Sequence, residues 1–505
     1  MKKLVSLLLV AIMALSLCSI SVAEEKVTLK LMNMYQTYNF EEQYAHGQIE
    51  AMTGYDIEWY MLPQENGAQQ LVLQVAAGEE YDMLLNMPVS ALTELQSQGL
   101  LMPLNDLLDE YFPLAYEHVS DAAWATATDE DGVIYTIPRE SANPNIDGTG
   151  DQFGAQNYGL LVNVDKLKAL NLELPTTIDE FYAVCKAYTE ATGNPALSLS
   201  NNPWETNVLM PAFGMGAARW YGAGDEFVHR LNHPGVVAYI EFMQKLYAEG
   251  LLDADFPLNS SGNVRTKFTN GTCLFMVAAF WDHDSNVGAF NANNNGVVPE
   301  LTYLPAMKLA EDDKVVLYRT AGINYANAIP YNSKHPVDAM KYLAIISTDD
   351  AAEAIYVGQE GVHHEKRNGT EYWPLYPDFT ALQNSDKFMG VASLAKQYAM
   401  WMARARKTET IGAAFADINS DIYETEVRYF FESYAQSNPD IAQNESVIDT
   451  KISDTMLALI VEGGDVPAAI AQLKEDLEEE NWSDYCAAYE EWYAENAASY
   501  YWTVK

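Results

Sequence analysis

The sequence has few cysteines and lacks the short motifs that mark common catalytic sites. Only four cysteines occur among its 505 residues, and three of them, Cys185, Cys273 and Cys486, lie far apart beyond the N-terminal segment. Three cysteines cannot form a complete disulfide framework, and no CxxC pair offers a zinc or redox site. HExxH, GxSxG, the phosphate-binding GxxxxGKS/T and a helix-opening GxGxxG are also absent. We therefore expect three small buried thiols, no cofactor, no catalytic residues and no enzyme activity.

Basic residues are also scarce. The chain carries 29 Lys and Arg against 71 Asp and Glu, a formal net charge of -42. Such a field repels phosphate backbones and anionic lipid, which excludes nucleic acid as a partner. The acidic excess is spread along the chain with only short runs such as 478–480, which is typical of a soluble secreted surface.

A long uncharged run occurs only at the N-terminus. Two lysines precede an uncharged stretch from Leu4 to Leu17, which is too short to span a bilayer comfortably, and small residues lead up to Ala23. We expect residues 1–23 to be a signal peptide that is cleaved after Ala23. The alternative is a lipoprotein cleavage site that leaves Cys18 lipidated. Both interpretations predict an extracellular protein associated with the cell envelope.

Strand and helix patterns alternate along the first part of the chain. Residues 26–34 and 55–61 have the pattern of strands, and a helix is expected between them at 40–52. The alternation begins again with a strand at 158–164, after a loop rich in Gly, Asn and Asp at 141–154. We therefore expect two α/β units with largely parallel sheets.

The last part of the chain is different. From Pro467 onward the pattern is almost entirely that of amphipathic helix. An aromatic stripe in this region has mostly helical spacing and is expected to pack in a core rather than to bind sugar. The stripe consists of Trp482, Tyr485, Tyr489, Trp492 and Tyr493.

One short segment of the sequence suggests a binding site. Residues 267–286 read KFTNGTCLFMVAAFWDHDSN, in which an apolar run ends at Trp281 and Asp282 follows. In parallel α/β sheets the carboxyl ends of strands face the ligand crevice. A flat ring there can cover the C–H face of a sugar while a carboxylate accepts hydrogen bonds from its hydroxyls. We expect Trp281 to be a stacking platform and Asp282 a hydroxyl acceptor, so that Trp281→Ala weakens sugar binding and leaves folding nearly intact.

Other side chains occupy comparable places. Tyr35 and Asn86 are expected at strand ends, and Trp204 lies in the polar loop LSNNPWETN. Plugging a loop is the alternative role for each of them, but their shared position near strand ends favours a cleft. Two triplets, 282–284 and 363–365, contain metal-ligand residue types. Adjacent loop residues point in different directions, so no metal site is expected.

An ordered set of segments resembles a known family. The segments are YDMLLNMPVSALTELQSQGLLMPLNDLLDEYFP, DGVIYTIPRE, YGLLVNVDKLKALNLELPTTIDEF and FTNGTCLFMVAAFW. Together they resemble the bacterial extracellular solute-binding proteins of ABC importers, family 1, and within it the LipO-like and alginate-oligosaccharide-binding branch. The resemblance implies a periplasmic-binding-protein-like type II fold, with two α/β lobes, a hinge and an interlobe ligand cleft.

The resemblance also implies where the lobes lie in the sequence. Lobe 1 is expected to contain residues 24–140 and 304–348. Lobe 2 is expected to contain residues 141–303 and 349–505, the latter with a C-terminal helical extension. The chain would cross between the lobes just after 137–139 and again near 302–305.

The function implied by the resemblance is that of a monomeric receptor, which captures a carbohydrate, in particular an oligosaccharide, and delivers it to ABC permease subunits. Arg139 and Arg319 lie near the crossings, where each could meet a uronate carboxylate or pair with surface acids. Tyr325 is a further candidate for the cleft, with core packing as its alternative. No DxDxDG calcium loop is present, so no bound ion is inferred. The sequence leaves neutral and acidic sugars equally open.

Two other functions are compatible with the sequence. One is a secreted carbohydrate-active hydrolase, which would need two carboxyl groups placed roughly 5 to 10 Å apart across the scissile bond. The other is the same fold with a peptide as its ligand. Product release from a polysaccharide panel distinguishes a hydrolase from a receptor.

Overall fold

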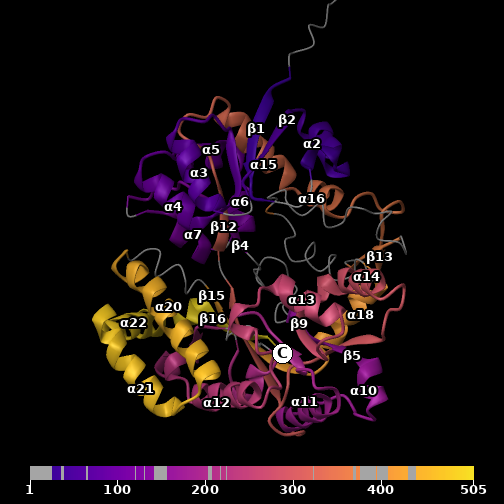
Figure 1. The fold of residues 1–505 in the computed structure, drawn as a ribbon. Coiled ribbons are helices and arrows are strands. Elements are labelled where there is room, and N and C mark those ends of the chain that lie inside the picture. The colour runs from indigo at the N-terminus through magenta and orange to yellow at the C-terminus, as the bar shows by residue number, and fades with distance from the viewer. Residues whose placement is uncertain are drawn as a thin grey trace, which may run out of the picture.

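The chain folds into two lobes, each of which contains its own β-sheets (Figure 1). The computed structural model describes residues 26–35, 39–63, 66–119, 121–129, 131–140, 156–202, 208–216, 218–222, 224–321, 323–367, 371–375, 394, 408–429 and 439–504. The expected signal peptide and Cys18 lie outside these residues. Among the helices so described, none combines the length and the apolar character that crossing a membrane requires.

The first lobe is built on a five-stranded sheet of order β2-β1-β3-β12-β4. Strand β1 runs parallel to β2 and β3, whereas β12 runs antiparallel to β3 and β4. The elements of this lobe are β1 (Thr28–Asn33), η1 (Phe40–Glu42), α2 (Tyr44–Thr53), β2 (Asp56–Met61), α3 (Gly67–Ala76), β3 (Met83–Pro88), α4 (Val89–Ser97), α5 (Asn105–Tyr111), α6 (Ala115–His118), α7 (Asp121–Ala127), β4 (Ile137–Glu140), β12 (Ile323–Ala328), α15 (Pro336–Ile346) and α16 (Asp349–Tyr356). The short strands β13 (His364–Arg367) and β14 (Glu371–Pro374) form a separate two-stranded sheet.

The second lobe contains a four-stranded sheet of order β10-β5-β9-β6 and a three-stranded sheet of order β11-β15-β16. Its elements are β5 (Tyr158–Asn163), α10 (Val164–Ala169), α11 (Ile178–Thr192), β6 (Leu197–Ser198), η2 (Met210–Phe213), β7 (Trp220–Tyr221), η3 (Gly224–Glu226), β8 (Val228–His229), η4 (Arg230–Asn232), α12 (Gly235–Ala248), η5 (Phe256–Leu258), α13 (Ser261–Thr269), β9 (Phe275–Ala279), η6 (Phe280–Asp282), α14 (His283–Asn293), β10 (Leu301–Leu304), β11 (Val315–Ala321), α18 (Glu409–Ile418), β15 (Ile422–Tyr429), α20 (Pro439–Glu462), α21 (Val466–Leu477), η7 (Glu478–Glu480), α22 (Trp482–Tyr500) and β16 (Tyr501–Val504).

The four-stranded sheet corrects one expectation from the sequence. Strand β5 runs antiparallel to both of its neighbours, β9 and β10, and only β6 and β9 are parallel. The expectation of largely parallel sheets is therefore wrong for this lobe. The alternation of strands and helices along the chain does not reveal the error, because a helical connection can lead to an antiparallel neighbour as well as to a parallel one.

Successive residues of β5 serve two different cores. Leu160 and Val162 pack with the core under α11 and α12, whereas Leu161 packs with the core on the opposite face, which includes Met276 of β9 and Ile418 of α18. Adjacent residues of a strand point to opposite faces of a sheet. The uninterrupted apolar run of β5 therefore indicates a strand that is covered by helices on both faces of the sheet.

The C-terminal helices complete the second core. Helix α20 packs on α12, and α21 and α22 follow it. Four rings of the predicted aromatic stripe are buried, and Trp492 is half-buried against the same core. Trp220 stacks on Phe227 with ring centroids 4.9 Å apart, and the ring of Tyr489 lies 4.8 Å from Trp220. The prediction that the stripe packs in a core is confirmed.

Charged groups also hold these helices in place. Arg219 forms ion pairs with Glu445 and with Asp449, the latter at 2.6 Å, and both acids belong to α20. His229 lies fully buried beside them, and burial together with the neighbouring Arg230 holds its pKa well below the ordinary value. Arg230 also pairs with Asp449, at 3.2 Å, so two of the scarce basic side chains attach the helical extension to the second lobe.

The observed lobes differ from the expected segments in two places. Strand β11 pairs with β15, and its Tyr318 ring lies 4.9 Å from Tyr221, so this strand belongs with the second lobe. Helix α16 contacts α2 and belongs with the first lobe. By these contacts the return to the first lobe falls between β11 and β12, later in the chain than the expected 302–305.

The three cysteines of the described chain are free and buried, as the sequence predicts. Burial raises the pKa of the Cys273 thiol to about 12. At neutral pH this thiol is protonated and therefore inert as a nucleophile.

Gly159 marks the closest packing around β5. A Cβ atom added there would meet Ile418 Cγ1 at 2.5 Å and Tyr303 Cδ1 at 2.9 Å. Ile418 is the last residue of α18, and Tyr303 lies on β10. The absence of a side chain at this position allows α18 and β10 to close over the start of β5.

We predict that Gly159→Ala lowers the free energy of unfolding by about 1–3 kcal/mol, the usual cost of overpacking a core. Gly288→Ala is the matched control, because Gly288 is an exposed residue of α14 with no atom within 4 Å of an added Cβ. There alanine should stabilise the helix by about 0.5–1 kcal/mol. Chemical denaturation measures both variants, and equal stability of the two would contradict the packing argument.

Candidate ligand-binding site

A hollow of about 180 Å³ lies on the second lobe between β9 and α13. Figure 1 places α13 and α14 at the edge of the second lobe nearest the first lobe, and β4 and β12 at the facing edge of the first lobe. The elements that line the hollow thus include one, α13, on the side of the second lobe nearest the first. Its lining residues are Tyr158, Leu199, Ser200, Ser261, Val264, Arg265, Met276, Val277, Ala278, Ala279 and Asp282.

Local sequence explains why these elements meet. Residues 276–279 of β9 supply an apolar wall, and the strand ends where η6 begins. Helix α13 begins at Ser261, and Ser260 caps it by accepting a hydrogen bond from the Asn263 amide at 3.2 Å. Because Ser261 and Arg265 are four residues apart, both side chains lie on the same face of α13.

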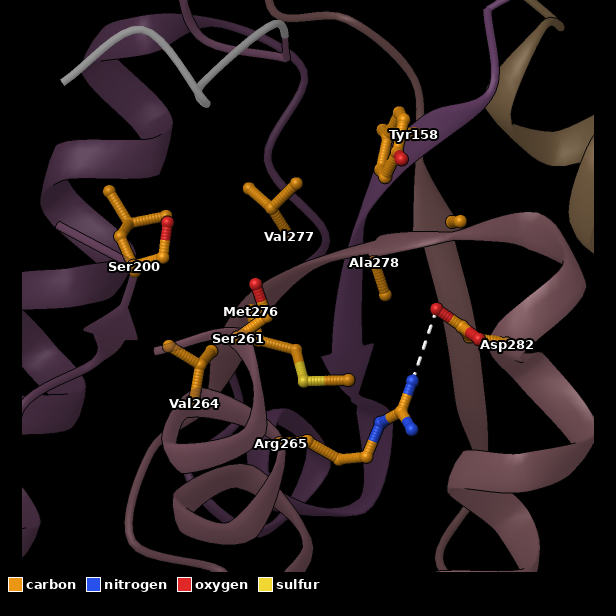
Figure 2. A pocket seen from close by; sticks show the side chains of 11 residues that line it. Tyr158, Ser200, Ser261, Val264, Arg265, Met276, Val277, Ala278 and Asp282 are labelled. Atoms are coloured by element: carbon orange, nitrogen blue, oxygen red, sulfur yellow. Dashed lines mark ion pairs between the residues drawn. The ribbon is translucent and has the colours of Figure 1, made fainter. Parts of the chain in front are cut away.

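The central polar feature of the hollow is an ion pair. Arg265 Nη2 lies 3.1 Å from Asp282 Oδ2, and both side chains are partly exposed. Figure 2 shows Arg265 extending from α13 toward Asp282. Such a pair contributes only about 0.2–1 kcal/mol to stability. It places a hydrogen-bond donor beside an acceptor, which suits neighbouring hydroxyl groups.

Tyr158 provides the exposed ring of the hollow. It is the first residue of β5 and lies opposite Ala279 in the antiparallel register. The residue is 39% exposed, and its ring meets Trp281 edge to face at 5.6 Å. Tyr158 was not among the candidates from the sequence, because it begins a strand rather than following one.

Trp281 has a different environment from the one predicted. Its ring is half-buried against the core, 4.9 Å from Phe280 and 5.6 Å from Tyr158. The described residues that line the hollow include its neighbour Asp282 but not Trp281 itself. Trp281 therefore contacts the Tyr158 ring edge to face, and its role as a stacking platform stays a prediction.

A buried network holds α13 in position. Lys267 Nζ contacts Asp253 at 2.5 Å, and Asp253 also accepts hydrogen bonds from Ser198 and Asn259, both at 2.9 Å. Burial alone would raise the pKa of Asp253, but the hydrogen bonds from Lys267 and Asn259 hold it below its ordinary value. The network connects α13 to β6 and to the loop before α13, so it fixes two sides of the hollow.

Three candidates from the first lobe lie on its sheet. Tyr325 of β12 is 37% exposed and pairs with Arg139 of β4, which is half-buried. Asn86 lies within β3 and is buried, with a φ of 56°. Its backbone N–H donates a hydrogen bond to Asn327 Oδ1 at 3.0 Å. Asn86 thus participates in strand packing, whereas Tyr325 and Arg139 are neighbours on the adjacent strands β12 and β4.

The remaining three candidates from the sequence are Tyr35, Arg319 and Trp204. Tyr35 is 38% exposed, two residues beyond the end of β1. Arg319 pairs through its backbone with Val427 in the three-stranded sheet. Trp204 lies outside the described residues.

The two His-containing triplets do not converge. Asp284 accepts hydrogen bonds from Thr408 at 3.0 Å and Thr410 at 2.7 Å, while Asp282 pairs with Arg265. Burial lowers the pKa of His283, whose ring lies 5.8 Å from Tyr303. In the part of the chain that is described, no three His, Cys, Asp or Glu side chains are grouped so as to hold a metal ion.

Residues 36–353 match the family model described as bacterial extracellular solute-binding protein. This match covers more than half of the chain. An uncharacterised protein from Niallia circulans is 30% identical over 225 residues, which are 44% of this chain and 85% of that protein.

Two characterised relatives are also similar in sequence. The fructooligosaccharide ABC transporter substrate-binding protein FusA of Streptococcus pneumoniae is 26% identical over 254 residues, or 46% of each chain. The polygalacturonan/rhamnogalacturonan-binding protein YtcQ of Bacillus subtilis is 22% identical over 362 residues, or 68% of each chain. The match to FusA thus spans about half of its length.

The solved structure of FusA with kestose superimposes with a TM-score of 0.65. The superposition covers 93% of this chain and 99% of FusA at 18% identity. The shared architecture is the type II periplasmic-binding-protein-like fold, as the sequence predicts.

The ring environments predict different stability effects at the two aromatic positions. Removal of a fully buried Trp costs about 3–5 kcal/mol, and we expect roughly half of that for Trp281→Ala because the ring is half-buried. Tyr158→Ala should cost about 1 kcal/mol or less, since this residue is more exposed than Trp281. Denaturant unfolding of both variants measures the difference. A smaller loss for Trp281→Ala than for Tyr158→Ala would restore the expectation that Trp281 can be removed with folding nearly intact.

Proposed function

The chain belongs to the bacterial extracellular solute-binding protein family, and from this we propose that it is a non-catalytic receptor of an ABC importer. It captures an oligosaccharide between its two lobes and delivers the sugar to the permease subunits. The single observation that carries this proposal is the hollow at the cleft-facing edge of the second lobe, where an exposed Tyr158 ring stands beside the Arg265–Asp282 pair.

The chemistry of the hollow suits a sugar. An apolar wall from β9 and an aromatic ring can cover the C–H face of a pyranose or furanose. The Arg265 guanidinium donates hydrogen bonds and the Asp282 carboxylate accepts them, and Ser261 adds an exposed hydroxyl. The carbohydrate ligands in the names of FusA and YtcQ support the same class of ligand.

The same site gives little support to a hydrolase. A glycosidase needs two carboxyl groups roughly 5 to 10 Å apart across the bond that it cleaves. Among the described residues that line the hollow, Asp282 is the one carboxylate, and it is paired with Arg265. We therefore infer binding without turnover, with a peptide as the alternative ligand for the same fold.

Membership of the extracellular solute-binding family supports a location outside the cytoplasm. We infer that it is a monomer, exported by residues 1–23 and associated with the cell envelope. The relative LipO of Bacillus subtilis is named a lipoprotein, which supports the alternative in which Cys18 is the first residue of the mature chain. N-terminal sequencing of the exported protein should begin at residue 24 for simple secretion, and a chain that begins at a lipidated Cys18 would contradict it.

We predict that the mature protein is stabilised by oligosaccharides that it does not cleave. Thermal unfolding should be measured against fructo-, gluco-, manno- and uronic-acid oligosaccharides and short peptides. At a ligand concentration of about 100 times the Kd, binding adds roughly 2.7 kcal/mol to stability and raises the Tm. Chromatography of the same mixtures should show intact sugar, and released products would establish a hydrolase. A shift with peptides alone would retain the fold and exclude the carbohydrate ligand.

Variants of two tyrosines complete this test. Tyr158→Ala should weaken sugar binding by about 3- to 10-fold, the value of one aromatic contact of about 0.5–1.5 kcal/mol. Tyr331→Ala is the matched control, because Tyr331 is 70% exposed and belongs to the first lobe, beyond β12. Equal affinities of the two variants in titration calorimetry would remove the Tyr158 ring from the binding site.

A further inference from the structure

We propose that the ligand is a neutral oligosaccharide rather than one that contains uronic acids, and that the Arg265–Asp282 pair sets this preference. The inference rests on the proposed function, since it names the class of sugar for that same site.

The charges of the hollow cancel. Its described lining contains one cation, Arg265, and one anion, Asp282, and these two are paired at 3.1 Å. The other polar side chains of the lining are the hydroxyl groups of Ser200, Ser261 and Tyr158. Hydroxyl groups and a neutralised ion pair bind sugar hydroxyls well but offer no net charge to a carboxylate.

A uronate would have to compete with Asp282 for the guanidinium. Because Asp282 occupies Arg265 Nη2, a second carboxylate that approached the same group would meet the negative charge of Asp282 at close range. Like charges at such distances repel strongly in a partly desolvated site. A neutral hydroxyl can instead bridge donor and acceptor without separating the pair.

The charge of the whole protein acts in the same direction. With 71 acidic and 29 basic residues, the net charge of -42 lowers the local concentration of anions around the molecule. Salt screens this repulsion beyond about 8 Å at physiological ionic strength, so it acts only close to the protein surface. There the net charge opposes the approach of an acidic oligosaccharide, whereas the ion pair opposes its binding.

A competing cation lies in the first lobe. Arg139 of β4 is half-buried and pairs in register with Tyr325 of β12, and these two strands lie on the side of the first lobe nearest the second (Figure 1). If this residue held a uronate, the class of ligand would be set by the first lobe instead. The test must therefore separate Arg139 from Arg265.

The experiment compares matched sugars. Each uronic-acid oligosaccharide, from alginate and from polygalacturonan, is titrated beside its carboxyl-reduced counterpart, and neutral fructo-, gluco- and manno-oligosaccharides complete the panel. We expect the sugars that bind to be neutral. Each carboxyl-reduced sugar that binds should have an affinity about tenfold or more above that of its acidic parent, which is at least ~1.4 kcal/mol of binding free energy. A uronic-acid oligosaccharide that binds more tightly than its reduced counterpart overturns the inference and leaves the receptor function intact. Failure of every sugar to bind overturns the proposed function, and the inference with it.

Charge variants assign the preference to the pair. Asp282→Asn frees the Arg265 guanidinium. The affinity for each uronic-acid oligosaccharide should then rise about tenfold relative to the affinity for its carboxyl-reduced counterpart. Arg265→Gln leaves Asp282 alone and should lower the acidic affinity further. Asp56→Asn is the matched control, because Asp56 belongs to an exposed ion pair with Lys26 in the first lobe and its replacement changes the net charge by the same amount. An equal rise in Asp56→Asn, or uronate binding that Arg139→Gln abolishes, would show that the Arg265–Asp282 pair does not set the preference.

Discussion

The antiparallel pairing of β5 with β9 is the constraint on which the candidate site depends. It places Tyr158 opposite Ala279, so that the start of one strand and the end of the other lie at the same edge of the sheet. The chain turns from this end of β9 directly into η6, which carries Asp282 toward Arg265. Gly159 allows α18 and β10 to pack closely over this end of β5, because a side chain there would collide with Ile418 and Tyr303. One pairing thus determines where the ring, the carboxylate and the guanidinium meet.

The scarcity of cations gives this arrangement its electrostatic character. Several of the 29 basic residues are used in attaching elements to one another: Arg219 holds α20, Lys267 holds α13, and Lys308 pairs with Asp421 at 3.2 Å just before β15. A buried or half-buried cation with a dedicated partner is costly to remove, since it leaves the partner charge unpaired. Arg265 differs from these cations, because both it and its partner Asp282 line the hollow. In the proposed site their pairing would act on the ligand as well as on stability.

The sequence predicts the elements of this protein better than their arrangement. Apolar spacing identified the buried C-terminal aromatic stripe, because amphipathic periodicity is a local property of the chain. It did not reveal that β5 is antiparallel to its neighbours, because strand direction depends on contacts distant in sequence. That gap explains why Tyr158 was missed: the rule that sites follow the carboxyl ends of strands applies to parallel sheets, whereas in an antiparallel pair an amino end lies there too. Arg265 gave no signal for a related reason, since its partner Asp282 lies seventeen residues further along the chain, across the strand β9.

The size of the hollow connects the site to the motion of the lobes. Its volume of about 180 Å³ is smaller than the roughly 300–1,000 Å³ of pockets that enclose a drug-sized ligand. An oligosaccharide bound there would extend beyond the hollow, toward β4 and β12 at the facing edge of the first lobe (Figure 1). Each lobe alone offers only part of the contact area, so tight binding requires the closed arrangement of the two. The apparent affinity is then the intrinsic affinity multiplied by the fraction of molecules that are closed, which couples sugar recognition in the second lobe to the hinge segments that join it to the first.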